Sequence, residues 1–526
     1  MKTNRYFGKI VLGIAFSLSL IITSCSGPHP TDTIPSNSKI VASFDLSHML
    51  KVAEVDDANS IKSLSLLDGQ MQNSSKELKS LWENLLKNPD NSGISFDQGV
   101  YLFRFDNESK GETNGCSMII KDVNKFKETV EVLCKDLSLT TESSNGLNMV
   151  HISSTNLVAW NDTHMLLISS LGEEASLLDK KVASLFTLDS DKCITSVDGF
   201  KELCAAPNDI TIWGSGTNLT ALSKFNPSLL LFKDLVKDCS MAVHVKFDDG
   251  QIVLNNEFYA PKEVKALLGK YWKDDFNKDL YKMFPENNIM ISGMVVNFEQ
   301  ILENLKGESY YTDADDMWKQ FAGTDIQTSV QSLGNSFMFS ITDMNYTKSR
   351  FRKSISPVIN CALDYNTKKE HKWLTDNLDK FCEKEESGCY RLTMGRNTNM
   401  YIAETDEVLF ISSEKDNVLR AIGQKKCDSD FTDSKIASHF TSTKGFWYLD
   451  LDYNHYPETT KKLVDDSFDK MQKQYIVGNM ALIQDIEITS NDALSSHVEI
   501  HLKNKKENSL KQIIHLVDES AMKFVQ

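Results

Sequence analysis

Two histidines four residues apart, His497 and His501, come closest in this sequence to a metal-binding pattern. Imidazole nitrogens bind zinc, copper and nickel, and residues at i and i+4 of a strand lie on one face. A metal site would need at least one further ligand from elsewhere in the chain. Val498 and Ile500 lie on the opposite face, and the preferred interpretation is therefore a strand that exposes both imidazoles.

Other short patterns fall short of known motifs. Gly214-Ser215-Gly216 follows a predicted strand but lacks the Gly-x-Ser-x-Gly form of a nucleophile elbow. Three acidic groups lie at 313–316, 428–430 and 450–452. None continues into the glycine and terminal glutamate of a calcium loop, so solvated turns or helix N-termini explain them better. We therefore expect no catalytic residue, no cofactor and no metal site.

Four cysteines fall at matching places in two predicted strand–helix segments, namely Cys116, Cys134, Cys361 and Cys382. A helix that folds back over its strand brings its end near the start of that strand, within reach of a disulfide. The first two and the last two are therefore candidate disulfide pairs. The alternative is that each pair consists of small buried side chains that face each other.

The elements that would position these residues occur twice along the chain. The clearest pair is a helix whose apolar positions i, i+4, i+7 and i+8 form one core-facing stripe. Its members recur at a constant offset of 248: Phe126, Val130, Leu133 and Cys134, then Leu374, Leu378, Phe381 and Cys382. A repeat of this length indicates duplicated domains rather than a solenoid.

Strands recur in the same order in both halves. The strand 165–170 matches 408–413, and Trp213 in 211–213 matches Trp447 in 445–447. Strands and helices without regular βαβ alternation predict an α+β fold, in which each half has a mainly antiparallel sheet and packed helices. We expect repeats at 34–283 and 284–526.

The N-terminus carries a targeting signal. Lys2, Arg5 and Lys9 precede an apolar run of 13 residues, 10–22, which is short for a membrane span. Thr23-Ser24-Cys25 then resembles a bacterial lipobox. We expect residues 1–24 to be a lipoprotein signal peptide and Cys25 to be the lipidated N-terminus, with palmitate as a typical acyl group.

Charge excludes one class of partner. The chain has 57 basic and 73 acidic residues and a net charge of −16. Residues 1–24 hold three basic residues and no acid, so the rest carries −19. Such a surface repels nucleic acid, and we expect no nucleic-acid partner.

Residues 25–33 form a short polar segment with two prolines, which we expect to act as an extended tether. Within it, Asp32-Thr33-Ile34 resembles a Bacteroides-type O-glycosylation acceptor, so Thr33 is a candidate modification site. Ser26 stands where an inner-membrane retention signal would place aspartate, which favours the outer membrane. Acidic residues of the surface-export type are missing directly after Cys25, which favours the periplasmic face over the cell surface.

The segment 34–46, Ile-Pro-Ser-Asn-Ser-Lys-Ile-Val-Ala-Ser-Phe-Asp-Leu, together with the lipobox resembles the opening of a Bacteroides-type cell-envelope lipoprotein family. The resemblance continues through 93–96 and 101–103. That family is known only as a domain of unknown function. The resemblance implies a large envelope lipoprotein and no activity.

Several functions remain open from the sequence. The first is a non-enzymatic envelope protein that binds an envelope protein or glycan, with the groove between the halves as its expected site. The second is a hydrolase of envelope or dietary glycans, which needs two carboxylates ~5–10 Å apart in a cleft. The third is a glycan-binding component of an uptake system.

Overall fold

The computed structural model consists of two compact units, which are described from residue 27 onward. Unit 1 comprises Met1–Pro261 and Asn504–Gln526, and unit 2 comprises Lys262–Lys503. The residues outside the described set are 1–26, 56–60, 65–73, 107–110, 171–174, 207, 217–237, 273–274, 308–309, 349–352, 367, 395–397, 427–428, 469–481 and 526.

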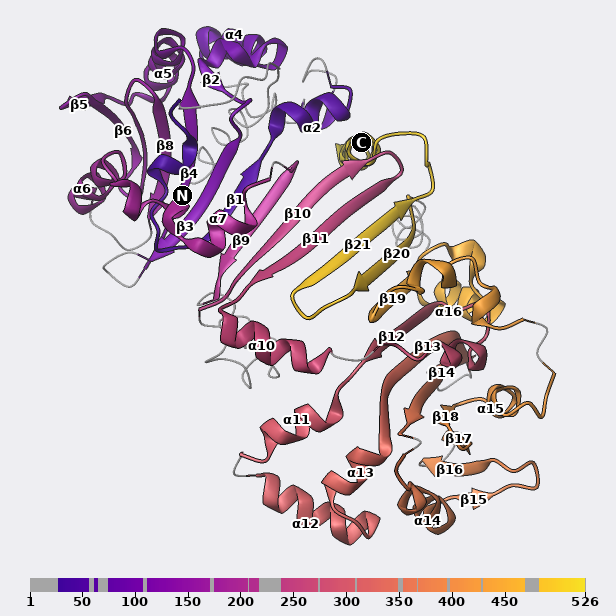
Figure 1. Cartoon of the computed structure of the whole chain (residues 1–526). Coiled ribbons are helices and arrows are strands. Elements are labelled where there is room, and N and C mark those ends of the chain that lie inside the picture. Colours follow the sequence, from indigo (N-terminus) through magenta and orange to yellow (C-terminus); the bar gives the residue numbers. More distant parts are fainter. Residues whose placement is uncertain are drawn as a thin grey trace. The chain divides into compact units, whose positions relative to one another are not determined.

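Unit 1 is built on an antiparallel sheet (Figure 1). Its strands are β1 (Ser38–Phe44), β2 (Ile94–Ser95), β3 (Val100–Asp106), β4 (Glu112–Ile120), β5 (Thr141–Ser144), β6 (Leu147–Ser153), β7 (Asn156–Trp160), β8 (His164–Ser170), β9 (Ile210–Ser215), β10 (Ser240–Asp248) and β11 (Gln251–Tyr259). Neighbouring strands pair in the order β11-β10-β9-β1-β3-β4-β8-β7-β6-β5, and β2 adds to β4.

The helices of unit 1 cover this sheet. They are α2 (Leu46–Val52), α4 (Lys76–Lys87), α5 (Val123–Leu137), α6 (Ala175–Leu185), α7 (Asp198–Leu203), α18 (Ser509–Val525) and the 3-10 helices η1 (Pro30–Thr33), η3 (Lys62–Leu64), η4 (Pro89–Ser92), η5 (Ser190–Lys192) and η6 (Ile194–Ser196). The N-terminal helices begin at capping side chains, as Asp45 before α2 shows by accepting the backbone N–H of His48. Trp213 and Phe126 lie in two separate apolar clusters under α6–α7 and α5.

Unit 2 has its own antiparallel sheet. Its strands are β12 (Met290–Val295), β13 (Leu333–Lys348), β14 (Lys353–Tyr365), β15 (Glu383–Lys384), β16 (Tyr390–Met394), β17 (Thr398–Glu404), β18 (Val408–Ser412), β19 (Gly445–Asp450), β20 (Ile483–Ser490) and β21 (Ser495–Leu502). They pair in the order β21-β20-β19-β12-β13-β14-β18-β17-β16-β15.

An aromatic cluster forms the core of unit 2. The helices are α10 (Lys262–Tyr271), α11 (Phe298–Leu305), α12 (Tyr311–Ala322), α13 (Ile326–Ser332), α14 (Lys372–Phe381), α15 (Lys415–Ala421), α16 (Glu458–Ser467) and the 3-10 helices η8 (Lys278–Met283), η9 (Phe431–Asp433), η10 (Ala437–Phe440) and η11 (Tyr453–His455). Phe446 stacks on Phe440 with ring centroids 4.4 Å apart and meets Tyr281 edge to face at 5.8 Å. These contacts fix η8 and η10 against the strand β19.

The predicted α+β class is confirmed, because the strand pairs described within each unit are all antiparallel. The two units also share one strand order, which is what a duplication predicts. The duplication itself stays a prediction. The expected boundaries differ from those of the structure, since the units divide after Pro261 and the chain after Lys503 belongs to unit 1 rather than to the second repeat.

The helix that closes each half therefore completes the other unit. Helix α10 follows β11 but packs against α11 in unit 2, and α18 follows β21 but packs against α2 and η3 in unit 1. Leu510 and Ile514 of α18 cover the buried cluster around Leu50. Asp518 accepts the backbone N–H groups of Lys62 and Ser63 at 2.9 and 2.8 Å, which caps η3. A boundary drawn along the sequence misses this exchange.

The predicted apolar helix stripes have different outcomes in the two units. On α5, Phe126, Val130 and Cys134 are buried, as expected. On α14, Leu378 is buried, whereas Phe381 is 45 % exposed and stacks on Phe321 of α12 at 4.9 Å. The stripe thus packs against the sheet in one unit and partly against a second helix in the other.

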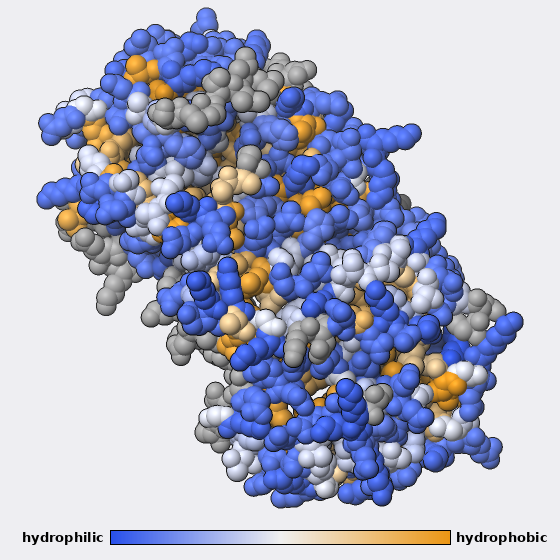
Figure 2. Space-filling view, in the orientation of Figure 1, coloured by the Kyte–Doolittle hydropathy of each residue, from blue (hydrophilic) through white to orange (hydrophobic). Residues whose placement is uncertain are grey.

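Hydrophilic residues dominate the surface visible in Figure 2. This agrees with the high charge of the sequence. In the part of the chain that the structure describes, no helix combines the length and the apolar character needed to cross a membrane.

Candidate functional sites in the two units

Unit 1 has an open cleft of about 990 Å³. Its wall includes residues 27–29 and two residues of η1, Thr31 and Asp32, together with the C-terminal end of β1 and the start of β3. Further lining residues come from α7 and from the residues 204–206 and 208 that follow it. A volume of this size is in the range that small ligands occupy.

The N-terminal wall is fixed by local hydrogen bonds. His29 caps η1 through its Nδ1, and its own backbone N–H donates to Asp32 Oδ2 at 2.8 Å, which completes a capping box. The carbonyl of Pro30 accepts from Ser117 Oγ at 2.8 Å. The expected extended tether thus does not reach residue 33, because Pro30–Thr33 is helical and packed against β4.

The lining of the cleft mixes aromatic and polar groups. Tyr101 stands beside His29, with ring centroids 5.4 Å apart, and Asp45, Asp97 and Asn208 supply carboxylate and amide groups. Burial raises the pKa of Tyr101 to about 12, and the nearby Cys204 and Asp45 act in the same direction. The phenol therefore stays protonated at neutral pH and can donate a hydrogen bond.

Of the two predicted modification sites, Cys25 and Thr33, the structure describes only Thr33. Cys25 lies outside the described residues. Thr33 is only 2 % exposed, and its hydroxyl contacts Ser117 Oγ at 2.8 Å and donates to the carbonyl of Pro30. A glycan on Thr33 would have to be attached before this segment packs, and the modification stays a prediction.

The candidate disulfide cysteines are all free thiols in this structure. Cys116 and Cys134 lie in one buried apolar cluster, which is the alternative that the sequence left open. Burial raises the pKa of the Cys116 thiol to about 12 and that of Cys361 to about 11. Cys382 is the C-cap residue of α14 and lies beside a small apolar cluster. Thiols of this kind are unreactive at neutral pH.

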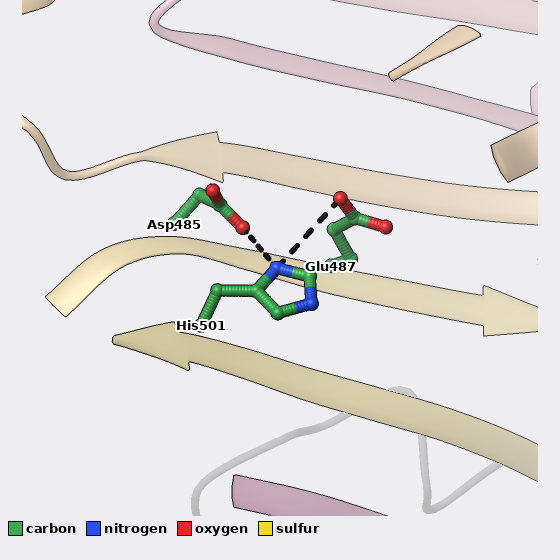
Figure 3. A group of neighbouring side chains, drawn as sticks. All are labelled: Asp485, Glu487 and His501. Atoms are coloured by element: carbon green, nitrogen blue, oxygen red, sulfur yellow. Dashed lines mark hydrogen bonds and ion pairs between the residues drawn. The ribbon is translucent and has the colours of Figure 1, made fainter. Parts of the chain in front are cut away.

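A second candidate site lies on the hairpin β20–β21 of unit 2. Asp485 and Glu487 alternate along β20, and the register of the hairpin places His501 of β21 opposite Asp485. Figure 3 shows the imidazole of His501 between the two carboxylates. Its Nδ1 lies 2.5 Å from Asp485 Oδ1 and 3.8 Å from Glu487 Oε1. The three groups form a set of oxygen and nitrogen atoms suited to a metal ion.

Three further side chains surround this group. Glu499 of β21 faces the other nitrogen of His501, with Oε2 at 3.1 Å from Nε2. The same carboxylate contacts His497 Nε2 through Oε1 at 3.0 Å. His439 of η10 places its Nδ1 3.1 and 3.0 Å from the two oxygens of Glu487. The site is thus a network of alternating carboxylates and imidazoles.

Burial differs across this network. Asp485 and Glu487 have side chains that are 5 % and 7 % exposed, and that of His501 is 15 % exposed. Burial raises the pKa of Glu487 above its ordinary value, although the hydrogen bond and charge of His439 act in the opposite direction. For Glu499, burial is outweighed by the contacts with His497 and His501, so its pKa lies below its ordinary value.

The sequence interpretation was partly wrong here. His497 and His501 do share a face of one strand, and His497 is 44 % exposed as expected. His501 is instead largely buried between carboxylates. The signal that could have revealed this is the alternation of Asp485 and Glu487 on the strand before it, since hairpin pairing brings alternating positions to one face.

Three of the acidic residues take the positions expected for them, but Asp450 is a buried residue at the end of β19 whose carboxylate accepts the backbone N–H of Asp452. Asp428 lies outside the described residues. Asp430 and Asp452 are N-cap residues of η9 and η11, and Asp313 lies in the first turn of α12. Trp160 and Trp213 are buried in apolar clusters, in agreement with a packing role.

The comparisons with known proteins identify the family. Residues 31–510 match the family described as a domain of unknown function (DUF4836), and the chain belongs to this family. No curated protein matches the chain.

Two solved structures show a weak similarity. "Structure of crystal form I of TP0453" matches with 11 % identity and a TM-score of 0.25, over 48 % of this chain and 88 % of that chain. "Structure of crystal form III of TP0453" matches with 9 % identity and a TM-score of 0.24, over 48 % of this chain and 89 % of that chain.

Proposed function

We propose that this protein is a lipid-anchored cell-envelope protein that binds a glycan without catalysing a reaction. The signal at residues 1–24 and the lipobox ending at Cys25 support the anchor. Ser26, in place of a retention aspartate, supports the outer membrane, and the lack of acidic residues directly after Cys25 supports the periplasmic face over the cell surface. The family match is compatible with this proposal and assigns no activity.

The observation that carries the proposal is that the lining of the cleft begins very close to Cys25 in the sequence. Gly27, which lines it, follows Cys25 by only two residues. Two residues span at most about 7 Å, so an acyl chain on Cys25 would hold this wall of the cleft at the membrane surface. The cleft would then take a ligand presented close to the membrane.

The lining supports a saccharide as the ligand. Sugars combine apolar ring faces, which pack on aromatic side chains, with hydroxyl groups that bond to carboxylates and amides. The cleft offers the ring of Tyr101 together with Asp45, Asp97 and Asn208. A protein partner in the envelope and a glycan-uptake system remain further forms of the same binding function.

The lipid anchor is tested by metabolic labelling with an alkyne fatty acid. Wild-type protein should be labelled and pelleted with outer membranes, and Cys25→Ala should lose the label. The control Cys204→Ala keeps the lipobox and should be labelled like wild type. An unlabelled wild-type protein would contradict the anchor.

Protease treatment of intact cells distinguishes the periplasmic face of the outer membrane from the cell surface. A periplasmic protein is digested only after the outer membrane is permeabilised.

The glycan ligand is tested by calorimetric titration with soluble peptidoglycan fragments and with plant-type oligosaccharides. Asp97→Asn and Asn208→Ala should weaken binding about tenfold, because the first replaces a charged acceptor with a neutral amide and the second removes an amide, each change being worth ~1–1.5 kcal/mol. Asp106→Asn is the matched control, since Asp106 is an exposed carboxylate on β3 outside the cleft. Release of new reducing ends during the titration would favour the glycan-hydrolase alternative instead.

A further inference from the structure

The side chains around His501 bring an unusual number of acceptor atoms together. Nδ1 faces oxygens of Asp485 and Glu487, and Nε2 faces an oxygen of Glu499. A neutral imidazole carries one N–H, so one of its nitrogens presents a lone pair. In the neutral ring this lone pair faces carboxylate oxygen, so a second proton or a bound cation must lie between them.

The buried carboxylates are also not balanced by lysine or arginine. Among the residues that the structure describes, the basic side chains within 4 Å of Asp485 and Glu487 are those of His501 and His439. Two carboxylates that are 5 % and 7 % exposed need a compensating positive charge, since an isolated buried charge costs several kcal/mol. A bound divalent cation would supply that charge.

The outer contacts have the form found around metal ligands. A metal-binding histidine commonly donates its second N–H to a carboxylate, which fixes the tautomer and aims the other nitrogen at the metal. Glu499 has this position relative to His501, with its oxygen 3.1 Å from Nε2. His439 likewise holds both oxygens of Glu487.

We propose that Asp485, Glu487 and His501 bind one divalent transition-metal ion of the zinc class, and that Glu499 and His439 orient these ligands. Two ligands about 2.1 Å from a tetrahedral ion lie roughly 3.4 Å apart. The contacts of Nδ1 with the two carboxylates, 2.5 and 3.8 Å, lie on either side of this separation. The ligand atoms of all three residues lie within 4.8 Å of one another, so shifts of about an ångström in each side chain would form the site.

The donor set selects the class of ion. One imidazole with two carboxylates suits zinc and its neighbours, whereas magnesium and calcium prefer sites built from oxygen alone. Three protein ligands leave the fourth position of a tetrahedral ion to a water molecule or to a group from a partner.

The test is metal binding by the purified full chain. The protein is stripped with a chelator, reconstituted with zinc, and analysed by elemental mass spectrometry and competition with a chromophoric chelator. Wild type should bind one zinc per chain at this site. Glu487→Gln and His501→Gln should each reduce the affinity at least tenfold.

The matched control is His48→Gln in unit 1. His48 Nδ1 lies 2.5 Å from Asp209 Oδ1, so this pair repeats the His–Asp contact, and among the described residues it does not belong to a group of three potential ligands. The control should bind zinc like wild type. Equal zinc binding by wild type and His501→Gln, or no stoichiometric zinc in wild type, would overturn the proposal.

A measurement on wild type alone guards against variants that fail to fold. Cobalt substitution should give the visible absorption bands of a four-coordinate site, and X-ray absorption at the zinc edge should show nitrogen and oxygen ligands that include one imidazole. A six-coordinate cobalt spectrum without imidazole scattering would contradict the assigned ligands.

Discussion

The two units share one strand order but differ in chemistry at one end of their outer hairpins. Strands β9 and β19 each pair with the first strand of their unit and with the next strand outward. When the two units are compared in this register, Trp213 of β9 and Phe446 of β19 take equivalent positions. Two residues further on, unit 2 has the row Tyr448, Glu487 and Glu499. The corresponding row of unit 1 is Ser215, Ser240 and Tyr259.

This difference shows what a strand framework leaves free. The buried aromatic ring is retained in both units, because it packs against a phenylalanine of the covering helix, Phe200 or Phe440. The side chains two residues further along the same strands do not take part in this aromatic contact. There the sequence can place neutral groups in one unit and a carboxylate–imidazole network in the other without changing the fold.

The largest expected effect comes from removing residues 504–526. This deletion takes α18 from unit 1 and exposes the cluster around Leu50. Burial of each large apolar side chain contributes ~1.5–3 kcal/mol, so the loss is comparable with the whole stability of a unit. Hydrogen exchange with mass spectrometry should show unit 1 unprotected and unit 2 protected. Equal protection of both units would break the assignment of α18 to unit 1.

Replacing the equivalent aromatic residues should have large and symmetrical effects. Trp213→Ala and Phe446→Ala each leave a cavity in a buried cluster, which costs ~3–5 kcal/mol. Each variant should lose amide protection chiefly in its own unit. The exposed Ile212→Ala is the control, since Ile212 lies on the same strand with 42 % exposure. A shift confined to the wrong unit would show that the aromatic positions are not equivalent.

Zinc bound at Asp485, Glu487 and His501 should stabilise unit 2 and not unit 1, and this effect should be of intermediate size. A ligand present at a hundred times its Kd stabilises the folded state by ~2.7 kcal/mol. The gain in protection should appear in unit 2 and be lost in His501→Gln. The same gain in unit 1 would contradict a site on β20–β21.

The smallest effect concerns a buried carboxyl that unit 1 lacks. Asp364 of β14 stands where β4 has Ser117, because the register that aligns Trp213 with Phe446 also aligns Gly115 of β4 with Ala362 of β14. Burial raises the pKa of Asp364, although the N–H of Ser336 opposes this shift. The folded state then holds the proton more tightly, so stability falls as pH rises from the ordinary value of 3.8 through the raised pKa.

The substitution Asp364→Asn should flatten that dependence in unit 2 and leave unit 1 unchanged. Urea unfolding followed by hydrogen exchange between pH 4 and 7 measures the slope for each unit. A slope in unit 2 that persists in Asp364→Asn would assign the dependence to another group.

Local patterns predicted much of the fold. The stripe on α5 and the strands β8 and β18, expected at 165–170 and 408–413, follow from side-chain patterns that depend on neighbours in sequence. The match of Trp213 with Trp447 was wrong by one position, because Phe446 lies on the core face. A one-residue shift reverses the face of every side chain, and similarity between short segments does not resolve it.

By itself, the sequence determined the α+β class and the acidic charge, and it predicted strands in the same order in both halves. Only the tertiary structure decided that the closing helices complete opposite units, that η1 folds against a cleft, and that His501 meets Asp485 and Glu487. Element formation depends on local periodicity and capping. These three features depend instead on contacts between residues far apart in sequence, or on strand register, which only the packed chain establishes.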